Sequence, residues 1–299
     1  MLEVLCFGEA LVDFFPDGIG PLAAARAFVP HVGGAPANVA IGLARQGVDV
    51  GFLGVVGQDG FGAFLESGLR EAGVNVAGLV RTREAQTGIC FVTRLEGGER
   101  GFTGYGAPAA ETAVPADAFP LELVRDTRVL HLGSNLLINP EGHTATWRAI
   151  AVAREAGARV ACDPNLRAHR WASQTAMRRE AIALLAAVDV VKLSLEEVLV
   201  LAGGADERAL PFREDAVVFV TEGAGGARWS YRGLTGRMGS PNIEAVDTTG
   251  AGDAFMAGAL AVLCRATQLD AAVLERAAAQ GCALGARACT AVGATAAFS

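Results

Sequence analysis

The chain has 299 residues, of which 52% are hydrophobic and 19% are charged, and its formal net charge is -7 at pH 7. This composition excludes an extensively disordered chain and allows one or two domains with a substantial core. The acidic balance argues against a general nucleic-acid-binding protein, which needs a clustered basic face, but it does not exclude a small anionic ligand.

Signals for membrane insertion and secretion are not visible. No stretch reaches the roughly 18 uninterrupted apolar residues of a transmembrane helix, and Met1–Val4 lack the basic start of a secretory signal. We therefore expect a soluble cytoplasmic protein that binds neither membranes nor nucleic acid.

Short apolar segments and longer Ala/Leu-rich segments alternate along most of the chain. The predicted strands are Val4–Phe7, Val50–Val56, Val129–Leu132, Val160–Cys162, Val188–Lys192 and Val217–Thr221. The predicted helices are Ala37–Gln46, Phe61–Ala72, Thr144–Ala156, Thr175–Leu185, Leu195–Leu201, Ala254–Ala266 and Leu269–Thr290. This alternation favours a largely parallel sheet covered by helices on both faces, and such sheets bind ligands at the carboxyl ends of their strands.

Two regions interrupt the alternation, and each contains a pair of short strand-like segments. The four predicted strands are Leu11–Phe15, Arg26–Val32, Thr87–Arg94 and Arg100–Tyr105. The second pair flanks Glu96–Glu99, which is typical of a hairpin turn. We expect these strands to form a small separate sheet from two excursions of the chain, at about 10–32 and 87–112.

A loop of small residues near the C-terminus is the sharpest local signal. Gly250-Ala251-Gly252 leads directly into an apolar helix that starts near Asp253. The first-turn N–H groups and the dipole of such a helix form a site for anionic oxygens. Asp253 is either an N-cap of this helix or a general base beside the anion site, and the combination of both features favours chemistry.

Two common nucleotide-binding patterns do not fit this loop. A dinucleotide fingerprint that begins at Gly250 needs a glycine where Phe255 stands, and no Walker A pattern occurs in the sequence. A nicotinamide oxidoreductase is therefore disfavoured, and any chemistry on ATP must use another type of loop.

Three motifs resemble those of the ribokinase-like (PfkB) family of carbohydrate kinases. Asp247–Phe255 resembles the family's second signature, and Gly33–Ala40 with Leu43–Gly47 resembles the first, which continues into Gly54–Gly62. The resemblance covers essentially the whole chain. It implies a single α/β domain over residues 1–299, a ribokinase-like three-layer sandwich with a mostly parallel central sheet and a small β lid.

The resemblance also implies roles for individual residues. Asp253 matches the catalytic base, and the anion site matches Gly250, Ala251 and Gly252. The positions that match sugar contacts are Asp13, Gly33, Gly34, Asn38, Asn165 and Arg167. Asn165 and Arg167 belong to a segment, Asp163–Arg167, that is similar to one found in fructokinases and 2-keto-3-deoxygluconate kinases.

A second group of positions matches the nucleotide and metal contacts of the family. The implied ATP-binding residues are Lys192, Ser194, Thr221, Gly223, Gly226, Gly252 and Cys282, of which Ser194 and Cys282 replace asparagines usual in the family. Glu197 matches a residue that organises Mg²⁺ through water. Asp247 and Thr249 match positions that help hold a monovalent cation in several relatives, and a requirement for potassium is left open.

The function implied by the resemblance is Mg²⁺- and ATP-dependent phosphorylation of a primary hydroxyl of a small sugar. Fructose is the first expected acceptor, because the motifs around Asp13 and Asp163 resemble fructokinases most closely. The alternatives are 2-keto-3-deoxygluconate, another neutral sugar or a nucleoside, and a noncatalytic sugar or nucleotide sensor. The acidic sugar is weakened because Thr103–Gly106 lacks an arginine that relatives carry there. The exposed edges of the lid sheet predict a homodimer that pairs through the lid.

Overall fold

The computed structural model describes residues 1–94, 100–105, 109–110, 117 and 119–298. Its main feature is a nine-stranded sheet in the order β13-β12-β11-β10-β9-β8-β1-β4-β5. The strands are β1 (Leu2–Phe7), β4 (Val50–Gly57), β5 (Asn75–Thr82), β8 (Thr127–Leu132), β9 (Arg159–Cys162), β10 (Val190–Ser194), β11 (Val217–Thr221), β12 (Ala227–Tyr231) and β13 (Leu234–Met238). All neighbouring strands pair parallel except β11 with β12 and β12 with β13, which pair antiparallel.

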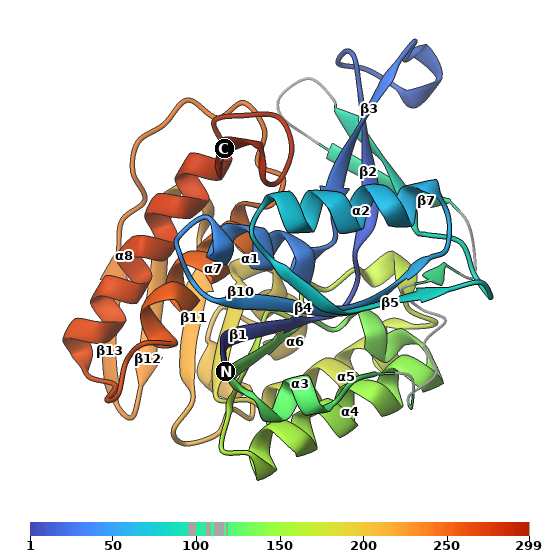
Figure 1. Cartoon of the computed structure of the whole chain (residues 1–299). Coiled ribbons are helices and arrows are strands. Elements are labelled where there is room, and N and C mark those ends of the chain that lie inside the picture. The colour runs from blue at the N-terminus through green and yellow to red at the C-terminus, as the bar shows by residue number, and fades with distance from the viewer. Residues whose placement is uncertain (95–99, 106–108, 111–116, 118, 299) are drawn as a thin grey trace.

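Helices cover both faces of this sheet (Figure 1). One face carries α1 (Ala35–Ala44), α2 (Gly60–Glu71), α7 (Ala251–Leu263) and α8 (Ala271–Ala288); the other carries α3 (Glu122–Arg125), α4 (Pro140–Glu155), α5 (Gln174–Leu185) and α6 (Leu195–Ala202). Alternate residues of each strand point to opposite faces, so in β1 Val4 and Cys6 pack in one core and Leu5 and Phe7 in the other. The predicted three-layer α/β architecture is confirmed.

The four short strands pair as the sequence predicts. They form a second sheet in the order β3-β2-β6-β7, with β2 (Leu11–Pro16), β3 (Phe28–Gly33), β6 (Ile89–Arg94) and β7 (Arg100–Tyr105). Figure 1 shows this sheet standing beyond the edge of the central one, on the side of α2. The predicted turn at 96–99 and the segments 106–108 and 111–112 of the second excursion lie outside the described residues. The assignment of residues 1–299 to one domain stays a prediction.

Three strands escape the sequence prediction, and some boundaries differ from it. β5 and β13 are the edge strands of the central sheet, and β12 lies next to β13; all three are partly exposed, so their sequences lack a continuous apolar run. The predicted helix Leu269–Thr290 starts later, because the Asp270 side chain accepts a hydrogen bond from the backbone N–H of Val273 and caps α8. Within the described residues, no helix combines the length and apolar character that crossing a membrane requires.

Candidate active site

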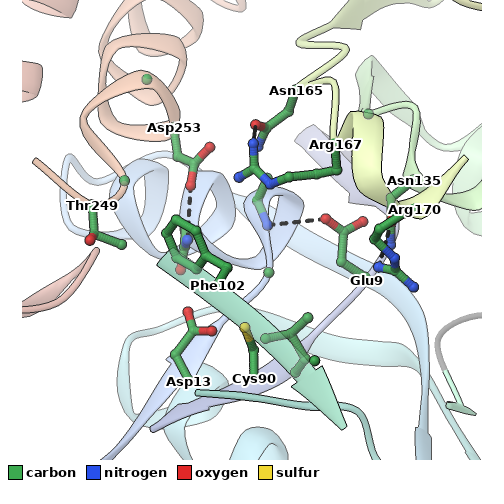
Figure 2. A pocket seen from close by; sticks show the side chains of 18 of the residues that line it. Glu9, Asp13, Cys90, Phe102, Asn135, Asn165, Arg167, Arg170, Thr249 and Asp253 are labelled. Atoms are coloured by element: carbon green, nitrogen blue, oxygen red, sulfur yellow. Dashed lines mark hydrogen bonds between the residues drawn. The ribbon is translucent and has the colours of Figure 1, made fainter. Parts of the chain in front are cut away.

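A cavity of about 540 Å³ lies where the small sheet meets the carboxyl ends of the central strands. Its wall includes Asp13, Cys90 and Phe102 from the small sheet, Asn38 from α1, Asn165 and Arg167 from the segment after β9, and residues 250–253 at the start of α7. Figure 2 shows these side chains gathered around one space. The cavity therefore lies where the strand-end rule predicts a ligand site.

Asp253 lies in the first turn of α7 and is only 8% exposed. The Nδ2 group of Asn38 donates a hydrogen bond of 2.8 Å to Asp253 Oδ2. The pKa of Asp253 is raised to about 6: burial and the charge of Asp163 raise it, and the hydrogen bond from Asn38 opposes this rise. A carboxyl group with such a pKa is largely ionised at neutral pH yet basic enough to accept a proton.

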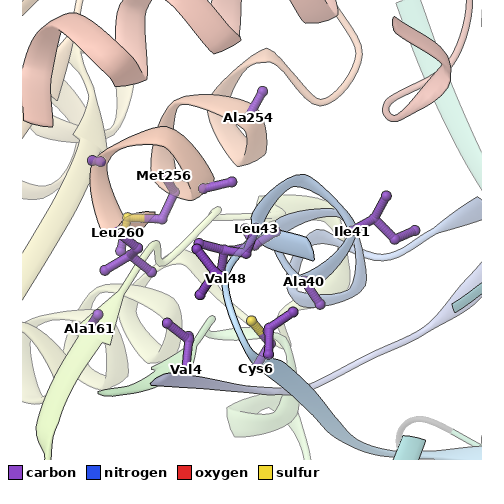
Figure 3. Close-up of a cluster of buried hydrophobic side chains, with 14 of the residues drawn as sticks. Val4, Cys6, Ala40, Ile41, Leu43, Val48, Ala161, Ala254, Met256 and Leu260 are labelled. Carbon is purple, nitrogen blue, oxygen red and sulfur yellow. The ribbon is translucent and has the colours of Figure 1, made fainter. Parts of the chain in front are cut away.

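The alternative role of Asp253 as the N-cap is wrong, because the N-cap of α7 is Gly250. Gly250 has a φ of 74°, and a Cβ there would lie 2.5 Å from the Cβ of Ala294. Only glycine therefore suits this position. Below the first turn, Met256 and Leu260 anchor α7 in the core beside β1 and α1 (Figure 3), so the carboxyl group of Asp253 is carried by a rigid element.

Lys192, the third residue of β10, lies beneath the same loop. Its Nζ is 2.9 Å from Asp163 Oδ2, and both side chains are buried. A Cβ added to Gly252 would lie 2.7 Å from this Nζ, so the loop and the ammonium group are in close contact. Burial alone would lower the pKa of Lys192, but the charges of Asp163 and Glu197 outweigh it and raise the pKa. The site thus contains a permanent cation next to the predicted anion loop.

The predicted sugar contacts of the small sheet and α1 surround Asp13. Asp13 is 7% exposed, and burial, followed by the charge of Asp253, raises its pKa to about 7. A Cβ on Gly33 would lie 2.2 Å from Asp13 Oδ2, and Gly34 has a φ of 97° with its Cβ position 2.5 Å from the carbonyl oxygen of Glu9. Both glycines are thus needed for the backbone to pass this close; Gly34 also lines the cavity, whereas Gly33 does not.

Glu197 holds the segment that carries Asn165 and Arg167. Its Oε1 accepts a hydrogen bond of 2.8 Å from the N–H of Leu166, and its Oε2 accepts one of 2.8 Å from the N–H of Ser194. Ser194 in turn caps α6 through its hydroxyl, which completes a capping box. Ser194, which stands where the family usually has asparagine, therefore serves as the N-cap of α6.

Arg167 connects this segment with the small sheet. Its guanidinium group donates to Asn165 Oδ1 and lies 5.8 Å from the centre of the Phe102 ring. Asn165 itself has a φ of 49°, which is uncommon for a residue other than glycine. The segment is therefore held in an unusual conformation that turns both side chains toward the cavity (Figure 2).

Most predicted nucleotide contacts lie outside the cavity. Thr221 ends β11 next to Ser194 of β10, and Gly223 begins the short turn that follows. Gly226 has a φ of 91°, and its Cβ would lie 2.0 Å from the carbonyl oxygen of Met238, so its glycine has a structural reason. Cys282 is buried in α8, with Sγ 3.8 Å from the same oxygen. Of the predicted ATP-binding residues only Lys192 and Gly252 line the cavity.

The two predicted monovalent-cation residues precede α7. Asp247 Oδ1 accepts hydrogen bonds from the N–H (3.0 Å) and the hydroxyl (2.7 Å) of Thr249, and Asp247 Oδ2 accepts one of 2.9 Å from the N–H of Gly293. These bonds tie the loop before α7 to the C-terminal loop. Within the part of the chain that the structure describes, no group of three or more His, Cys, Asp or Glu side chains is arranged to hold a metal ion.

The sequence analysis did not single out several polar residues of the cavity wall, among them Glu9, Asn135 and Arg170. Glu9 and Asn135 follow β1 and β8, so the strand-end rule could have found them. Arg170 ends a short 3-10 helix, Ala168–Arg170, and carries no comparable signal.

Comparison with known proteins agrees with the motifs. Residues 1–299 match the pfkB family of carbohydrate kinases. Fructokinase-1 of Zea mays is 40% identical over 269 residues, which cover 86% of this chain and 81% of that protein. A fructokinase from Xylella fastidiosa with bound ATP has 33% identity and a TM-score of 0.86, covering 99% of this chain and 95% of its own. A double mutant of Vibrio cholerae O395 fructokinase, bound to fructose, ADP and potassium, has 31% identity and a TM-score of 0.88, covering 99% and 94%.

Proposed function

The chain belongs to the pfkB family of carbohydrate kinases, and we propose that it transfers the γ-phosphoryl group of ATP to the C6 hydroxyl of fructose, giving fructose 6-phosphate. The fructokinase of Zea mays and the fructose-bound structure from Vibrio cholerae support fructose as the acceptor. The ATP-bound fructokinase from Xylella fastidiosa supports ATP as the phosphoryl donor.

The observation that carries the proposal is the position of Asp253. Its buried carboxyl group stands at the start of α7, is oriented by Asn38, and faces a cavity that holds a second carboxyl group, Asp13. In the proposed reaction Asp253 removes the proton from the primary hydroxyl as that oxygen attacks phosphorus. The first-turn N–H groups of residues 250–252 and the ammonium group of Lys192 stabilise the negative charge of the transferring group.

The sugar lies, in this proposal, between the small sheet and α1. Asp13 and Asn38 offer acceptors and a donor to its hydroxyls, with Gly33 and Gly34 providing the close backbone and Asn165 and Arg167 closing the other side. The small sheet acts as a lid that keeps water, a competing acceptor, away from the phosphoryl group. We place the rest of the ATP beside this cavity, along β10, β11 and α8. The remaining predicted ATP contacts there are Ser194, Thr221, Gly223, Gly226 and Cys282.

Magnesium fits this arrangement as an ion carried mainly by phosphate oxygens and water. Mg²⁺ usually keeps several waters and is bound through few protein groups together with substrate phosphates. When bound, the ion neutralises charge on the phosphates. We place Glu197 in its outer shell, where the carboxylate acts through water while it accepts the N–H groups of Leu166 and Ser194.

Potassium activation is a separate part of the proposal. Asp247 and Thr249 stand next to the anion loop, but both oxygens of Asp247 already accept hydrogen bonds, so a cation would share them. The potassium in the Vibrio cholerae structure motivates the comparison of rates with and without this ion. Cytoplasmic location and pairing of two chains through the lid also remain predictions.

The test is ADP release from Mg-ATP with fructose, 2-keto-3-deoxygluconate, ribose, other hexoses and nucleosides, each with and without potassium. We expect the highest kcat/KM for fructose, with phosphate on C6 rather than C1 by ³¹P NMR. A higher kcat/KM for another acceptor would contradict the choice of fructose. Absence of turnover with every acceptor, together with nucleotide or sugar binding, would favour a noncatalytic sensor.

A further inference from the structure

A buried ion pair lies beneath the anion loop. Lys192 is the third residue of β10, and Asp163 directly follows β9. Because the residues just before them are paired in the parallel register, Lys192 and Asp163 come next to each other at the carboxyl ends of these strands. Both side chains point to the face that α1 and α7 cover, since the residues two positions earlier, Val190 and Ala161, pack in that core.

The ammonium group of Lys192 lies between a carboxylate and the loop. Its Nζ is 2.9 Å from Asp163 Oδ2, and a Cβ added to Gly252 would lie 2.7 Å from the same Nζ. Lys192 is 5% exposed and lines the cavity, whereas Asp163 is 3% exposed and does not line it. Asp163 therefore acts on anything bound in the cavity only through its neighbours.

Folding stability is a weak reason for this ion pair. The free energy of taking two charges out of water can exceed the energy of their attraction, so such pairs often add little to stability. The Oδ1 atom of Asp163 is also buried and has no hydrogen-bond partner among the described residues. Buried polar atoms without partners are rare in proteins, which favours a role of Asp163 in the chemistry of the site.

Lys192 has other carboxylates that attract it. Besides Asp163, the charges of Glu197 and Asp253 raise the pKa of Lys192, so both carboxylates lie close enough to act on its ammonium group. A lysine side chain is a flexible stem that carries a point charge, and one strong partner is needed to fix it. A Lys192 that paired with Asp253 would stabilise the ionised form of the proposed base and hinder proton transfer.

The charge of Asp163 also acts on Asp253 directly. It raises the pKa of Asp253 and is second only to burial in this effect. Other groups that face the carboxyl group of Asp253 are Asn38, Lys192, Arg167 and Asp13. The first three lower the pKa of Asp253, and Asp253 raises the pKa of Asp13. The like charge of Asp163 therefore makes Asp253 a stronger base.

We propose that Asp163 is a positioning residue, which holds the ammonium group of Lys192 at the anion loop and keeps it away from Asp253. The inference rests on the proposed phosphoryl transfer and adds a residue to it. As the acceptor oxygen bonds to the γ-phosphorus and the bond from phosphorus to ADP breaks, the hydroxyl proton passes to Asp253. Lys192 then faces the charge on the transferring group, and Asp253 stays free to take the proton.

Asp163→Asn tests this role, because it keeps the shape of the side chain and an oxygen for Lys192 but removes the charge. The readout is the pH dependence of kcat at saturating fructose and Mg-ATP, where bound sugar already engages Asp13. We expect the acid limb to move to lower pH by about one unit, since the like charge is lost and Lys192 can pair with Asp253. The plateau kcat should fall about tenfold. The KM for fructose should stay nearly unchanged, because Asp163 does not line the cavity.

Lys192→Met shows whether Asp163 acts through the lysine. It should move the acid limb to higher pH, because the charge of Lys192 lowers the pKa of Asp253, and it should lower kcat about 10²-fold. Adding Asp163→Asn to Lys192→Met should change kcat by less than about threefold, because there is no lysine left to position. The same addition should raise the melting temperature, because it removes an unpaired buried charge. A merely structural role of Asp163 predicts that the two losses of kcat multiply.

Asp189→Asn is the matched control. Asp189 stands at the amino ends of the same two strands, where it accepts the N–H of Val160 and pairs with Arg213. Its replacement should leave the acid limb where it is. An unmoved limb in folded Asp163→Asn, or losses of kcat that multiply, would overturn the proposal. If Asp163→Asn does not fold, the double variant decides, because it has no unpaired charge: its limb must lie at lower pH than that of Lys192→Met.

Failure of the proposed function gives a different result. If another sugar is the acceptor, the choice of fructose fails, and the same profiles with that sugar decide the role of Asp163. If no acceptor reacts, the kinase proposal fails, and thermal unfolding at pH 7.5 decides instead. Asp253→Asn should then raise the melting temperature less in the Asp163→Asn protein than in the wild type, and an equal rise would contradict the effect of the Asp163 charge.

Discussion

Replacing Asp253 with asparagine should abolish most of the activity and make the protein more stable. The substitution keeps the shape of the side chain, and the amide oxygen can still accept the hydrogen bond from Asn38 Nδ2, which is 2.8 Å long in the wild type. What it removes is the proton acceptor and the buried charge. Loss of a general base lowers rates by about 10²- to 10⁴-fold, so kcat should fall by this factor.

The gain in stability follows from the pKa of Asp253, which is raised from its usual 3.8 to about 6 by burial and by the charge of Asp163. Between these two values the folded protein binds more protons than the unfolded chain, so stability falls as the pH rises through this interval. Above about pH 6 the buried charge of Asp253 lowers the folding stability by its full amount. A shift of roughly two units corresponds to about 3 kcal/mol, which the asparagine variant recovers at pH 7.5. For a chain of this length the melting temperature should rise by about 5 °C.

Two measurements test this reasoning on the same protein samples. Coupled ADP release at saturating fructose gives kcat, and thermal unfolding at pH 7.5 and pH 5 gives the stability difference, which should be larger at pH 7.5. Asp59→Asn is the opposite control. Burial would raise the pKa of Asp59, but hydrogen bonds from Thr87 and Gly62 hold this pKa below its usual value. Replacing Asp59 should therefore destabilise the fold and retain most of kcat. An Asp253→Asn variant with more than a tenth of the wild-type kcat would refute the assignment of the base; a less stable variant would refute the stability argument.

Three further predictions concern other parts of the molecule. The kcat/KM for fructose should fall below about pH 6 as Asp253 takes up its proton, and Asn38→Ala should move this acid limb to higher pH, because the bond from Asn38 lowers the pKa; an unmoved limb in pH–rate profiles would contradict this. Glu197→Gln should raise the Mg²⁺ concentration for half-maximal rate several-fold; a higher KM for sugar with an unchanged Mg²⁺ titration would restrict Glu197 to holding Leu166. Val29→Asp, which adds a charge to an exposed apolar position of β3, should shift the protein to monomer in size-exclusion chromatography; wild-type monomer would rule out pairing through the lid.

The sequence alone predicts those features that depend on residues close together in the chain. The strand-helix alternation and the four short strands follow from local apolar patterns, which the structure confirms in the two sheets. The anion loop at residues 250–252 follows from small residues placed directly before a helix, since any helix exposes its first N–H groups. The partly exposed strands β12 and β13 show the limit of this approach, because such segments carry weak apolar patterns.

Only the tertiary structure decides which distant residues meet. Asn38 and Asp253 are 215 positions apart and share a hydrogen bond because α1 and α7 pack on the same face of the sheet. Lys192 of β10 lies close to the loop at Gly252. Glu9 and Asn135 lie near each other because they follow β1 and β8, which are neighbours in the sheet although more than a hundred residues separate these two strands in the chain. The pKa of each acid depends on burial by such nonlocal neighbours, and no local pattern in the sequence encodes it.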